Sequence, residues 1–477
     1  MIRRWVSALA IAATLAGCGG GGSGSTAGSS TTGGTATTTA TAASTCSLRD
    51  RQDWAFQQLQ QWYLFSETLP ANLDPTPYAD VQSYIDALTA TARSQRRDRN
   101  FTYLTSIASE DAYYNSGASA GFGVRVVTDG AAGRVFISEA FEGAPALAAG
   151  IDRGTEITAI GTTTADLRTV SSIIAAEGTA GVTNALGPST AGTTRLLRIT
   201  DAAGSRDVNV TKADYSLTPV SSRYGTRIIT EGGKPYGYLN LRTFISTAEA
   251  PLRSAFAQFR AAGVTNVVID LRYNGGGLVS ISELIGDLLG AARSTSDVLD
   301  YTTFRPEKAA NNSTRYFQPQ SQSIAPMKLA FIGTGGTASA SELTINAQIP
   351  YLHANAALIG TNTYGKPVGQ IALDRAACDD RLRVIAFATQ NASRQGNYFD
   401  GLASVVEASC QAADDYAHPL GDPQEGSTRA ALNFLEGVSC TRISAGEATS
   451  QSAAGGRREL LIPADPTTAQ RETPGLF

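Results

Sequence analysis

A short stretch of the chain, Val267-Val268-Ile269, is apolar at every position. Strands that cover a core with one face alternate apolar and polar residues, whereas a strand buried on both faces is apolar throughout. The residue patterns predict further strands at 236–241, 329–333 and 356–360, and helices at 252–259, 278–288 and 339–348. This alternation of strand and helix predicts a layered α/β core.

Two glycine-rich turns follow two of these strands, at 270–277 and at 333–339. Loops at strand ends are where α/β proteins usually build their sites. Neither turn has the spacing of a P-loop, and the first also lacks the glycine spacing of a dinucleotide site. Each turn taken alone is equally consistent with a simple tight turn.

The 477 residues favour about three domains of ordinary size, and a hydrophobic content of 42% favours folded cores. Composition changes along the chain and divides it into regions. We predict a helical N-terminal region at 46–118, a β-rich domain at 119–215, an α/β core with a C-terminal extension at 216–443, and a loosely ordered tail at 444–477. Residues 19–45 are almost all Gly, Ser, Thr and Ala, which predicts a flexible linker.

The first 18 residues have the pattern of an export signal. Arg3 and Arg4 precede a short apolar run that ends before Cys18. Leu15-Ala16-Gly17-Cys18 resembles the lipobox of bacterial lipoproteins, in which the cysteine is lipidated after cleavage. The alternative is an ordinary secretory signal with a chance cysteine. The resemblance implies a cell-envelope protein held to the membrane by lipid, and Gly19 favours an outer-membrane anchor that faces the periplasm.

Four further cysteines stand at positions 46, 378, 410 and 440. An exported chain meets oxidising conditions, so one or two disulfides are expected, and three full pairings are open. Free buried thiols are the alternative. Because only two histidines and no Cys-x-x-Cys occur, we predict no metal site and no cofactor. The acidic pair Asp414-Asp415 is expected to lie in a solvated loop rather than to bind calcium.

The β-rich region begins with the glycine loop Gly121-Phe122-Gly123-Val124 and continues into a short helix at 144–151 and a strand at 156–161. This order resembles a PDZ domain of the bacterial protease type, although Thr155 stands where aspartate is usual. The resemblance implies that the loop N–H groups bind the carboxylate of an extended peptide. A PDZ-like spacer that binds nothing is the alternative.

Three motifs of the core occur in a fixed order: Asp270-Leu271-Arg272-Tyr273-Asn274-Gly275-Gly276-Gly277, then Ser339-Ala340-Ser341-Glu342, then Thr363-Tyr364-Gly365-Lys366. Together with the run from Asp98 to Leu104, they resemble the C-terminal processing (tail-specific) peptidases over about residues 98–373. The resemblance implies an α/β core of the crotonase/ClpP-like kind. It also implies a serine endopeptidase that cleaves unfolded or flexible protein C-termini, with an envelope adaptor protein as a possible partner.

The resemblance also assigns roles to residues. It implies that Ser339 is the nucleophile, with Ser341 as the competing choice, that Lys366 is the base and that Gln370 orients the lysine. The backbone N–H groups of Ala340 and of Gly276, with Gly277 next, are the implied oxyanion donors. The interval from Ser339 to Lys366 is about two residues longer than the family pattern, as judged from the resemblance.

Independent chemistry points the same way, because a serine hydroxyl needs a neighbouring base. The histidines, His353 and His418, lie outside the motifs, which disfavours a Ser-His-Asp triad. A lysine acts as a base once burial lowers its pKa, and Tyr364, Pro367 and Val368 are suitable apolar company for Lys366. With a net charge of -4 and no basic stripe, nucleic acid is not expected as a partner. The rival hypotheses are a non-catalytic module that binds apolar ligands and a PDZ scaffold on a vestigial core.

Overall fold

The computed structural model describes residues 46–444 and 458–477, so the predicted signal, Cys18 and the linker at 19–45 lie outside the described residues. A six-stranded sheet organises the core, in the order β10-β11-β12-β15-β16-β19. All its neighbouring strands run parallel except the β10–β11 pair. Its strands are β10 (Thr226–Glu231), β11 (Lys234–Asn240), β12 (Asn266–Asp270), β15 (Lys328–Gly333), β16 (Ala356–Gly360) and β19 (Ala408–Gln411).

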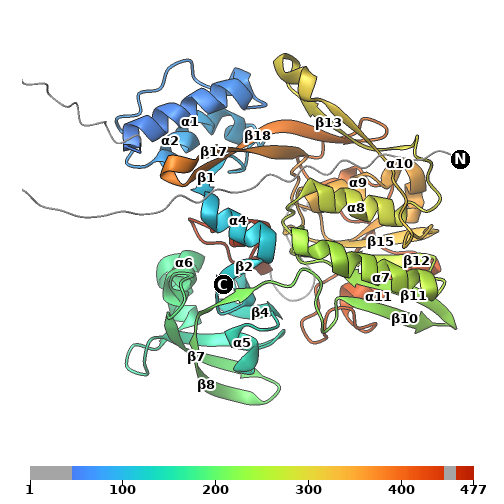
Figure 1. The fold of residues 1–477 in the computed structure, drawn as a ribbon. Coiled ribbons are helices and arrows are strands. Elements are labelled where there is room, and N and C mark those ends of the chain that lie inside the picture. Colours follow the sequence, from blue (N-terminus) through green and yellow to red (C-terminus); the bar gives the residue numbers. More distant parts are fainter. Residues whose placement is uncertain (1–45, 445–457) are drawn as a thin grey trace, which may run out of the picture. The chain divides into compact units, whose positions relative to one another are not determined.

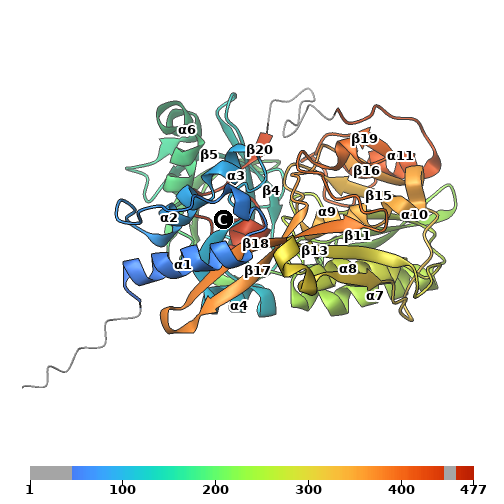
Figure 2. The ribbon, with the colours of Figure 1, turned by 90° about the horizontal axis from the view of Figure 1, so that it is seen from above.

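Helices cover both faces of this sheet (Figure 2). On β12, Val267 and Ile269 face the cluster that contains α7 and α8, while Val268 faces α11. The uninterrupted apolar run is therefore explained, because each face of the strand is buried. The core helices are η2 (Ser246–Ala248), α7 (Glu249–Ala261), α8 (Val279–Leu289), α9 (Ala340–Asn346), α10 (Ile349–Leu352), η4 (His353–Asn355) and α11 (Gly426–Glu436).

A second sheet, of five strands, lies between the core and the N-terminal helices (Figure 1). Its long strand, β18 (Asp380–Asn391), pairs with β1 (Tyr103–Ser106), β13 (Val298–Phe304) and β17 (Val368–Arg375), and β13 pairs with β14 (Ser313–Tyr316). Short 3-10 helices lie in the connections of this part: η3 (Pro306–Asn311), η5 (Ala376–Cys378) and η6 (Leu402–Ser404).

The N-terminal helices share their core with this second sheet instead of forming one of their own. Leu59, Tyr63 and Ile85 are buried in one cluster with Leu382 and Val384 of β18. The elements are α1 (Leu48–Trp62), η1 (Ser66–Thr68), α2 (Val81–Leu88), α3 (Ala90–Ser94) and α4 (Ile107–Ser116). The predicted helical character is confirmed, and the strand β1 is an addition that the sequence patterns did not indicate.

The β-rich region folds around a sheet in the order β20-β3-β4-β5-β7-β8, with β6 on β5. The short helix α5 and the strand β5 fall where the sequence predicted a helix and a strand. The elements are β2 (Ala118–Gly121), β3 (Val124–Asp129), β4 (Arg134–Ala140), α5 (Pro145–Ala148), β5 (Glu156–Gly161), β6 (Arg168–Thr169), α6 (Val170–Leu186), β7 (Thr194–Asp201), β8 (Gly204–Thr211) and β9 (Ala213–Ser216). Strands β2 and β9 pair and carry the chain into and out of this region.

The prediction of a loosely ordered tail at 444–477 is wrong for residues 458–477. This segment forms β20 (Arg458–Leu460), which extends the β-rich sheet, and α12 (Thr468–Glu472). A capping box between Thr467 and Gln470 stabilises the N-terminus of α12. Leu461 and Phe477 are buried, at 3% and 2% exposure. A few well-placed apolar side chains therefore anchor a segment whose composition looked weakly structured.

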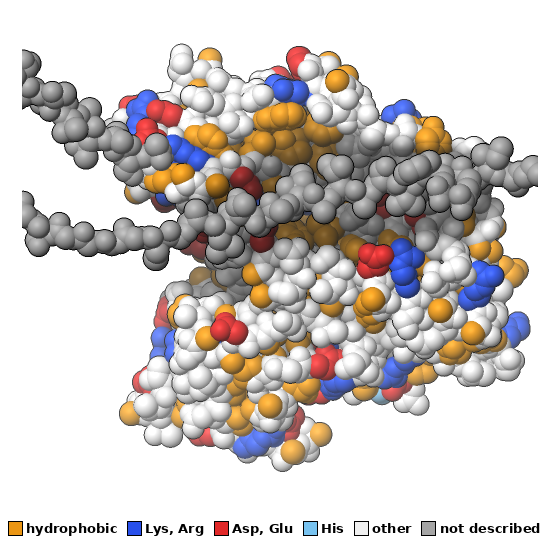
Figure 3. All heavy atoms as spheres, in the orientation of Figure 1, with side chains coloured by type: hydrophobic (Ala, Val, Ile, Leu, Met, Phe, Trp, Pro, Cys, Tyr) orange, Lys and Arg blue, Asp and Glu red, His pale blue; other side chains and the backbone are white. Residues whose placement is uncertain are grey.

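The cysteines form two disulfides, Cys46–Cys378 and Cys410–Cys440, with Cα–Cα distances of 5.5 and 5.4 Å. The expectation of disulfides is confirmed, and the first bridge ties the start of the helical region to η5, which follows β17. In the described ranges 46–444 and 458–477, no helix combines the length and the apolar character that crossing a membrane requires. On the face shown in Figure 3, acidic and basic side chains are interspersed without a patch of one sign.

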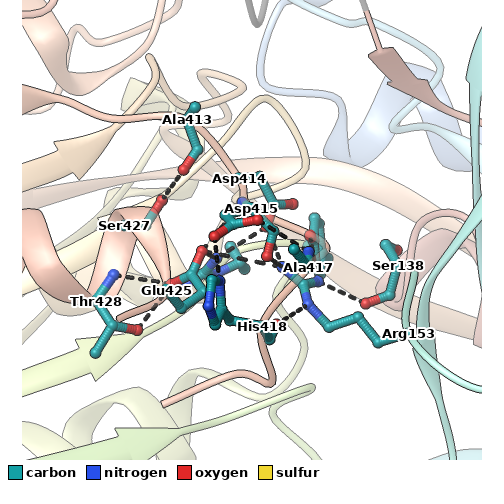
Figure 4. Close-up of polar contacts among 12 residues, drawn as sticks. Ser138, Arg153, Ala413, Asp414, Asp415, Ala417, His418, Glu425, Ser427 and Thr428 are labelled. Carbon is teal, nitrogen blue, oxygen red and sulfur yellow. Dashed lines mark hydrogen bonds and ion pairs between the residues drawn. The ribbon is translucent and has the colours of Figure 1, made fainter. Parts of the chain in front are cut away.

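An ion-pair network joins the β-rich region to the core (Figure 4). Arg153 donates to Asp414 at 2.5 Å, and Arg272 donates to the same carboxylate at 3.0 Å and to Glu425 at 2.8 Å. Asp414 is only 7% exposed, so the expectation that the acidic pair lies in a solvated loop is wrong for this residue. Two arginines from distant segments neutralise a carboxylate that would otherwise be too costly to bury.

Candidate active site

The predicted nucleophile lies at the start of α9, directly after the second glycine-rich turn. Ser339 has φ 57° and ψ −116°, a conformation that a serine adopts only under constraint. The constraint is visible, because Ala338 N–H donates to Asn274 O at 3.0 Å and Ser339 N–H donates to Glu342 Oε2 at 3.0 Å. The turn therefore holds the serine at a helix N-terminus, where the helix dipole favours negative charge.

The first glycine-rich turn lies against this serine. A Cβ placed on Gly276 would be 2.8 Å from Ser339 Cβ and 3.1 Å from Ala340 N, so only glycine fits there. The Ala340 N–H belongs to the first turn of α9, where the helix itself offers no acceptor. The structure thus brings Gly276, Ser339 and Ala340 together.

The N–H groups of the two candidate glycines differ. Gly276 N–H donates to Asn274 Oδ1 at 3.0 Å, so this group is engaged within its own turn. Among the described residues, Gly277 N–H has no hydrogen-bond acceptor. Gly277 packs closely against the backbone of Phe244, since a Cβ on Gly277 would lie 2.3 Å from Phe244 O. In this conformation an incoming oxyanion would have to displace Asn274 before Gly276 could bind it.

Lys366 is buried beside the same turns, at 9% exposure. Burial lowers its pKa, and the nearby carboxyls of Glu472 and Asp98 partly oppose that shift. Its Nζ lies 4.8 Å from the centre of the Phe101 ring and donates to Gln370 Oε1 at 2.7 Å. Burial therefore makes it easier for this amine to lose its proton, and the neutral amine is the form that accepts one.

Gln370 is itself fixed by a bond that the sequence did not reveal. Its Nε2 donates to Phe101 O, and Phe101 N–H donates to Asp98 Oδ1 at 2.8 Å. Asp98 also accepts from Tyr63 OH at 2.8 Å. The Asp98–Leu104 run thus supports the lysine through the glutamine. Its resemblance to a family motif was the available signal, but nothing in the sequence indicated the contact.

Glu342 joins the Ser339 segment to the Lys366 segment, a role that the sequence motif alone did not indicate. Its side chain is fully buried and accepts four donors. They are Ser339 N–H at 3.0 Å, Lys366 N–H at 2.7 Å, Gly365 N–H at 2.7 Å and Thr363 Oγ1–H at 2.7 Å. Burial raises the pKa of Glu342 and the four donors oppose that shift, since an ionised carboxylate is the acceptor they require.

Two other predicted residues take different places. Ser341 is fully buried and donates from Oγ to Asn274 O at 3.0 Å, which makes it part of the scaffold of the first turn. No hydrogen bond joins Ser339 Oγ to Lys366 Nζ in the described part of the chain, since the lysine is turned to Gln370. The loop at Gly121–Val124 lies in the β-rich region, at the start of β3.

The two glycine-rich turns and the Lys366 segment line a cavity of about 740 Å³. Lys366, Tyr364, Ala338 and Gly275 line this cavity, and so do residues 462–466 and 470–472 of the C-terminal segment. In the ranges 46–444 and 458–477, no group of three or more His, Cys, Asp or Glu side chains is placed to hold a metal ion.

A glycine-cradled serine at a helix N-terminus and a buried lysine on an adjoining segment of the same α/β core are groups that a serine-type peptidase requires. Residues 235–395 match the sequence model of Peptidase family S41, so the chain carries an S41 peptidase domain. The predicted resemblance to this family of C-terminal processing peptidases is confirmed.

Curated relatives agree with the match. The chain is 26% identical over 328 residues to Carboxyl-terminal-processing peptidase 3 of Arabidopsis thaliana, which covers 66% of this chain and 57% of the relative. It is 27% identical over 161 residues to the carboxyl-terminal-processing protease of Picosynechococcus, covering 34% of this chain and 35% of that protein. The chain therefore spans little more than half of the first relative's length.

A solved structure supports the fold. The putative S41 protease from Bacteroides fragilis aligns with a TM-score of 0.62 at 23% identity, covering 81% of this chain and 97% of that one. At that identity the likeness concerns the fold alone.

Proposed function

We propose that the protein is a serine endopeptidase that cleaves protein chains near their C-terminus through an acyl-enzyme on Ser339. The observation that carries the proposal is the buried Glu342 carboxylate, which binds the backbone of both Ser339 and Lys366. It fixes the nucleophile and the base relative to each other inside an S41 domain. A binding module would have no need for a strained serine held opposite a desolvated lysine.

The proposed reaction uses groups already described. Lys366 Nζ takes the proton from Ser339 Oγ as that oxygen attacks the substrate carbonyl carbon. The N–H groups of Ala340 and of Gly276 or Gly277 stabilise the oxyanion. The peptide C–N bond then breaks as the protonated lysine gives its proton to the leaving amine. The neutral lysine next takes a proton from a water molecule that attacks the acyl carbon, and it returns this proton to Ser339 Oγ as the bond between that oxygen and the acyl carbon breaks.

The location of the protein remains part of the proposal. The Cys18 lipobox supports a lipid anchor in the bacterial cell envelope, with the body facing the periplasm. The two disulfides support an oxidising compartment. The substrates proposed are unfolded or flexible protein C-termini, reached with or without an envelope adaptor.

A cleavage assay on an unfolded protein labelled at its C-terminus tests the activity. Ser339→Ala and Lys366→Ala are each expected to lower kcat/KM by about a thousandfold or more. The matched controls are Ser313→Ala and Lys234→Ala, which change exposed residues of the same types. Mass spectrometry of the products locates the cut. Equal cleavage by all five proteins, or none by the unsubstituted chain, would contradict the proposal.

A further inference from the structure

Residues 458–477 lie along the outer edge of β3. β20 pairs antiparallel with residues 127–129 of that strand, and Leu461 N–H donates to Val126 O at 3.0 Å. Farther along the chain, Val126 N–H donates to Gly475 O at 2.7 Å and Phe477 N–H donates to Val124 O at 2.9 Å. The same strand thus holds both ends of the segment, and Figure 1 shows the C-terminal end beside the β-rich region.

The end of this segment occupies the glycine loop. The main-chain oxygen of Phe477 accepts Gly123 N–H at 2.8 Å and Val124 N–H at 3.2 Å. Gly121 leaves the room for this approach, because a Cβ on it would lie 2.7 Å from the Phe477 carbonyl carbon. The Phe477 side chain is buried in one cluster with Phe122 of the loop and Val182 of α6. Strand addition with loop N–H groups on a main-chain oxygen is the way extended chain ends are bound.

Between its two anchors the segment crosses the catalytic cleft. Gly275 N–H donates to Glu472 O at 3.0 Å, which places the backbone of α12 on the first glycine-rich turn. Tyr114 OH donates to Glu472 Oε1 at 3.0 Å and holds its side chain near the lysine. The Glu472 carboxyl acts to raise the pKa of Lys366 and so favours the protonated, non-basic amine.

While the segment is bound, the side chains of Lys366 and Ser339 are not joined by a hydrogen bond in the described part of the chain. Lys366 Nζ is bonded to Gln370 instead. Gly276 N–H is bonded to Asn274. Four separate observations therefore agree that the bound segment accompanies an unready site. The glycine loop is occupied, the segment crosses the cleft, no hydrogen bond joins Ser339 to Lys366 among the described residues, and Gly276 N–H is already bonded.

We propose that residues 458–477 are an intramolecular ligand of the Gly121–Val124 loop, and that a substrate ending in a bulky apolar residue binds the same groove and must displace them. The groove is defined as the outer edge of β3 between the loop and α6. Its apolar pocket, now filled by Phe477, selects the final side chain of the incoming chain. Release of the segment uncovers the cleft and removes Glu472 from Lys366. The regulatory half of this inference rests on the proposed peptidase function, whereas the binding half does not.

Peptide binding to the Ser339→Ala chain tests the groove without hydrolysis. The probe is a fluorescent peptide with the sequence of residues 472–477 and a free carboxylate, measured by anisotropy. Phe477→Asp is expected to tighten binding by about tenfold or more, since a buried carboxylate cannot replace the phenyl ring. Met327→Asp is the matched control, because Met327 is 67% exposed, and it is expected to bind like the Ser339→Ala chain.

The outcomes separate the two halves. Equal affinity with and without Phe477→Asp, or no binding to either chain, would overturn the inference. If the Phe477→Asp variant unfolds, Phe477→Ala replaces it in the test. Phe477→Ala must then also bind the peptide more tightly than the chain that keeps Phe477. An affinity that varies with protein concentration would assign the bound segment to a second copy and overturn the intramolecular form.

Hydrolysis tests the regulation. In the chain with Ser339 present, Phe477→Asp is expected to raise cleavage of an unfolded protein about tenfold at low substrate concentration, and Met327→Asp to leave it unchanged. Unchanged cleavage by Phe477→Asp beside tighter peptide binding would overturn the regulatory half. If the groove binds peptide but neither the unsubstituted chain nor the Phe477→Asp chain cleaves the unfolded protein, the result would instead refute the proposed function.

Discussion

Glu342 Oε2 accepts the backbone N–H of Lys366 at 2.7 Å, although the two residues lie on different segments of the core. The same oxygen accepts Ser339 N–H at 3.0 Å. A single buried atom therefore sets the distance between the segment that carries the nucleophile and the segment that carries the base.

Replacing this carboxylate by an amide tests the arrangement. In Glu342→Gln, the new NH₂ group faces N–H donors and leaves at least one of them unpaired. We expect kcat/KM to fall by about a hundredfold and stability to fall by about 2–3 kcal/mol. Glu307→Gln is the control, because that side chain is 70% exposed. Urea unfolding and the cleavage assay provide the two readouts, and unchanged values for Glu342→Gln would refute the positioning role.

The pH dependence of cleavage reports the state of Lys366. Because burial lowers its pKa from 10.5, cleavage should rise with pH with a midpoint below 10.5. Gln370→Glu places a second acidic group at Nζ, which favours the protonated amine and should move the midpoint to higher pH. Glu472→Gln removes a carboxyl that raises the pKa of Lys366, so it should move the midpoint to lower pH. Shifts in the opposite directions would exclude Lys366 as the titrating base.

The oxyanion assignment is tested at Gly276. Its φ of 114° and its contact with Ser339 leave no space for a methyl group. Gly276→Ala is therefore expected to lower kcat by about a hundredfold or more, with a smaller effect on KM. Gly263→Ala is the control, because it also changes a glycine of positive φ, but one with nothing within 4 Å of its Cβ. A fall in kcat as large in the control would remove the specific role of Gly276.

The sequence predicted the parts of this molecule that depend on local patterns. Buried strands such as 267–269 are apolar at every position, and glycine-rich turns mark the strand ends. The sequence could therefore predict the α/β core and the motifs that contain Ser339 and Lys366. The position of Phe477 could not be predicted from the sequence. Residues 475–477 have no periodic pattern, and they pair with β3, which lies far away in the sequence. Asp414 was misjudged for a similar reason. Its partner Arg153 belongs to another region, and only the tertiary fold brings the two charges together.

A buried acid outside the catalytic site gives the last prediction. Asp300 in β13 is 2% exposed, and burial together with the nearby Glu283 raises its pKa to about 7. The folded state therefore binds a proton more tightly than the unfolded state, whose carboxyl titrates near 4. Stability must then fall as the pH rises from about 4 to about 7, and the loss is complete above that range.

Asp300→Asn resembles the protonated acid at every pH, so it should be more stable than the unsubstituted chain at pH 8, by at most about 4 kcal/mol. The gain should shrink steadily toward pH 4. Urea denaturation at several pH values measures it, with Asp400→Asn as the control, since that side chain is 75% exposed. A gain that is the same at pH 4.5 and pH 8 would mean that the substitution acts through packing and not through the ionisation of Asp300.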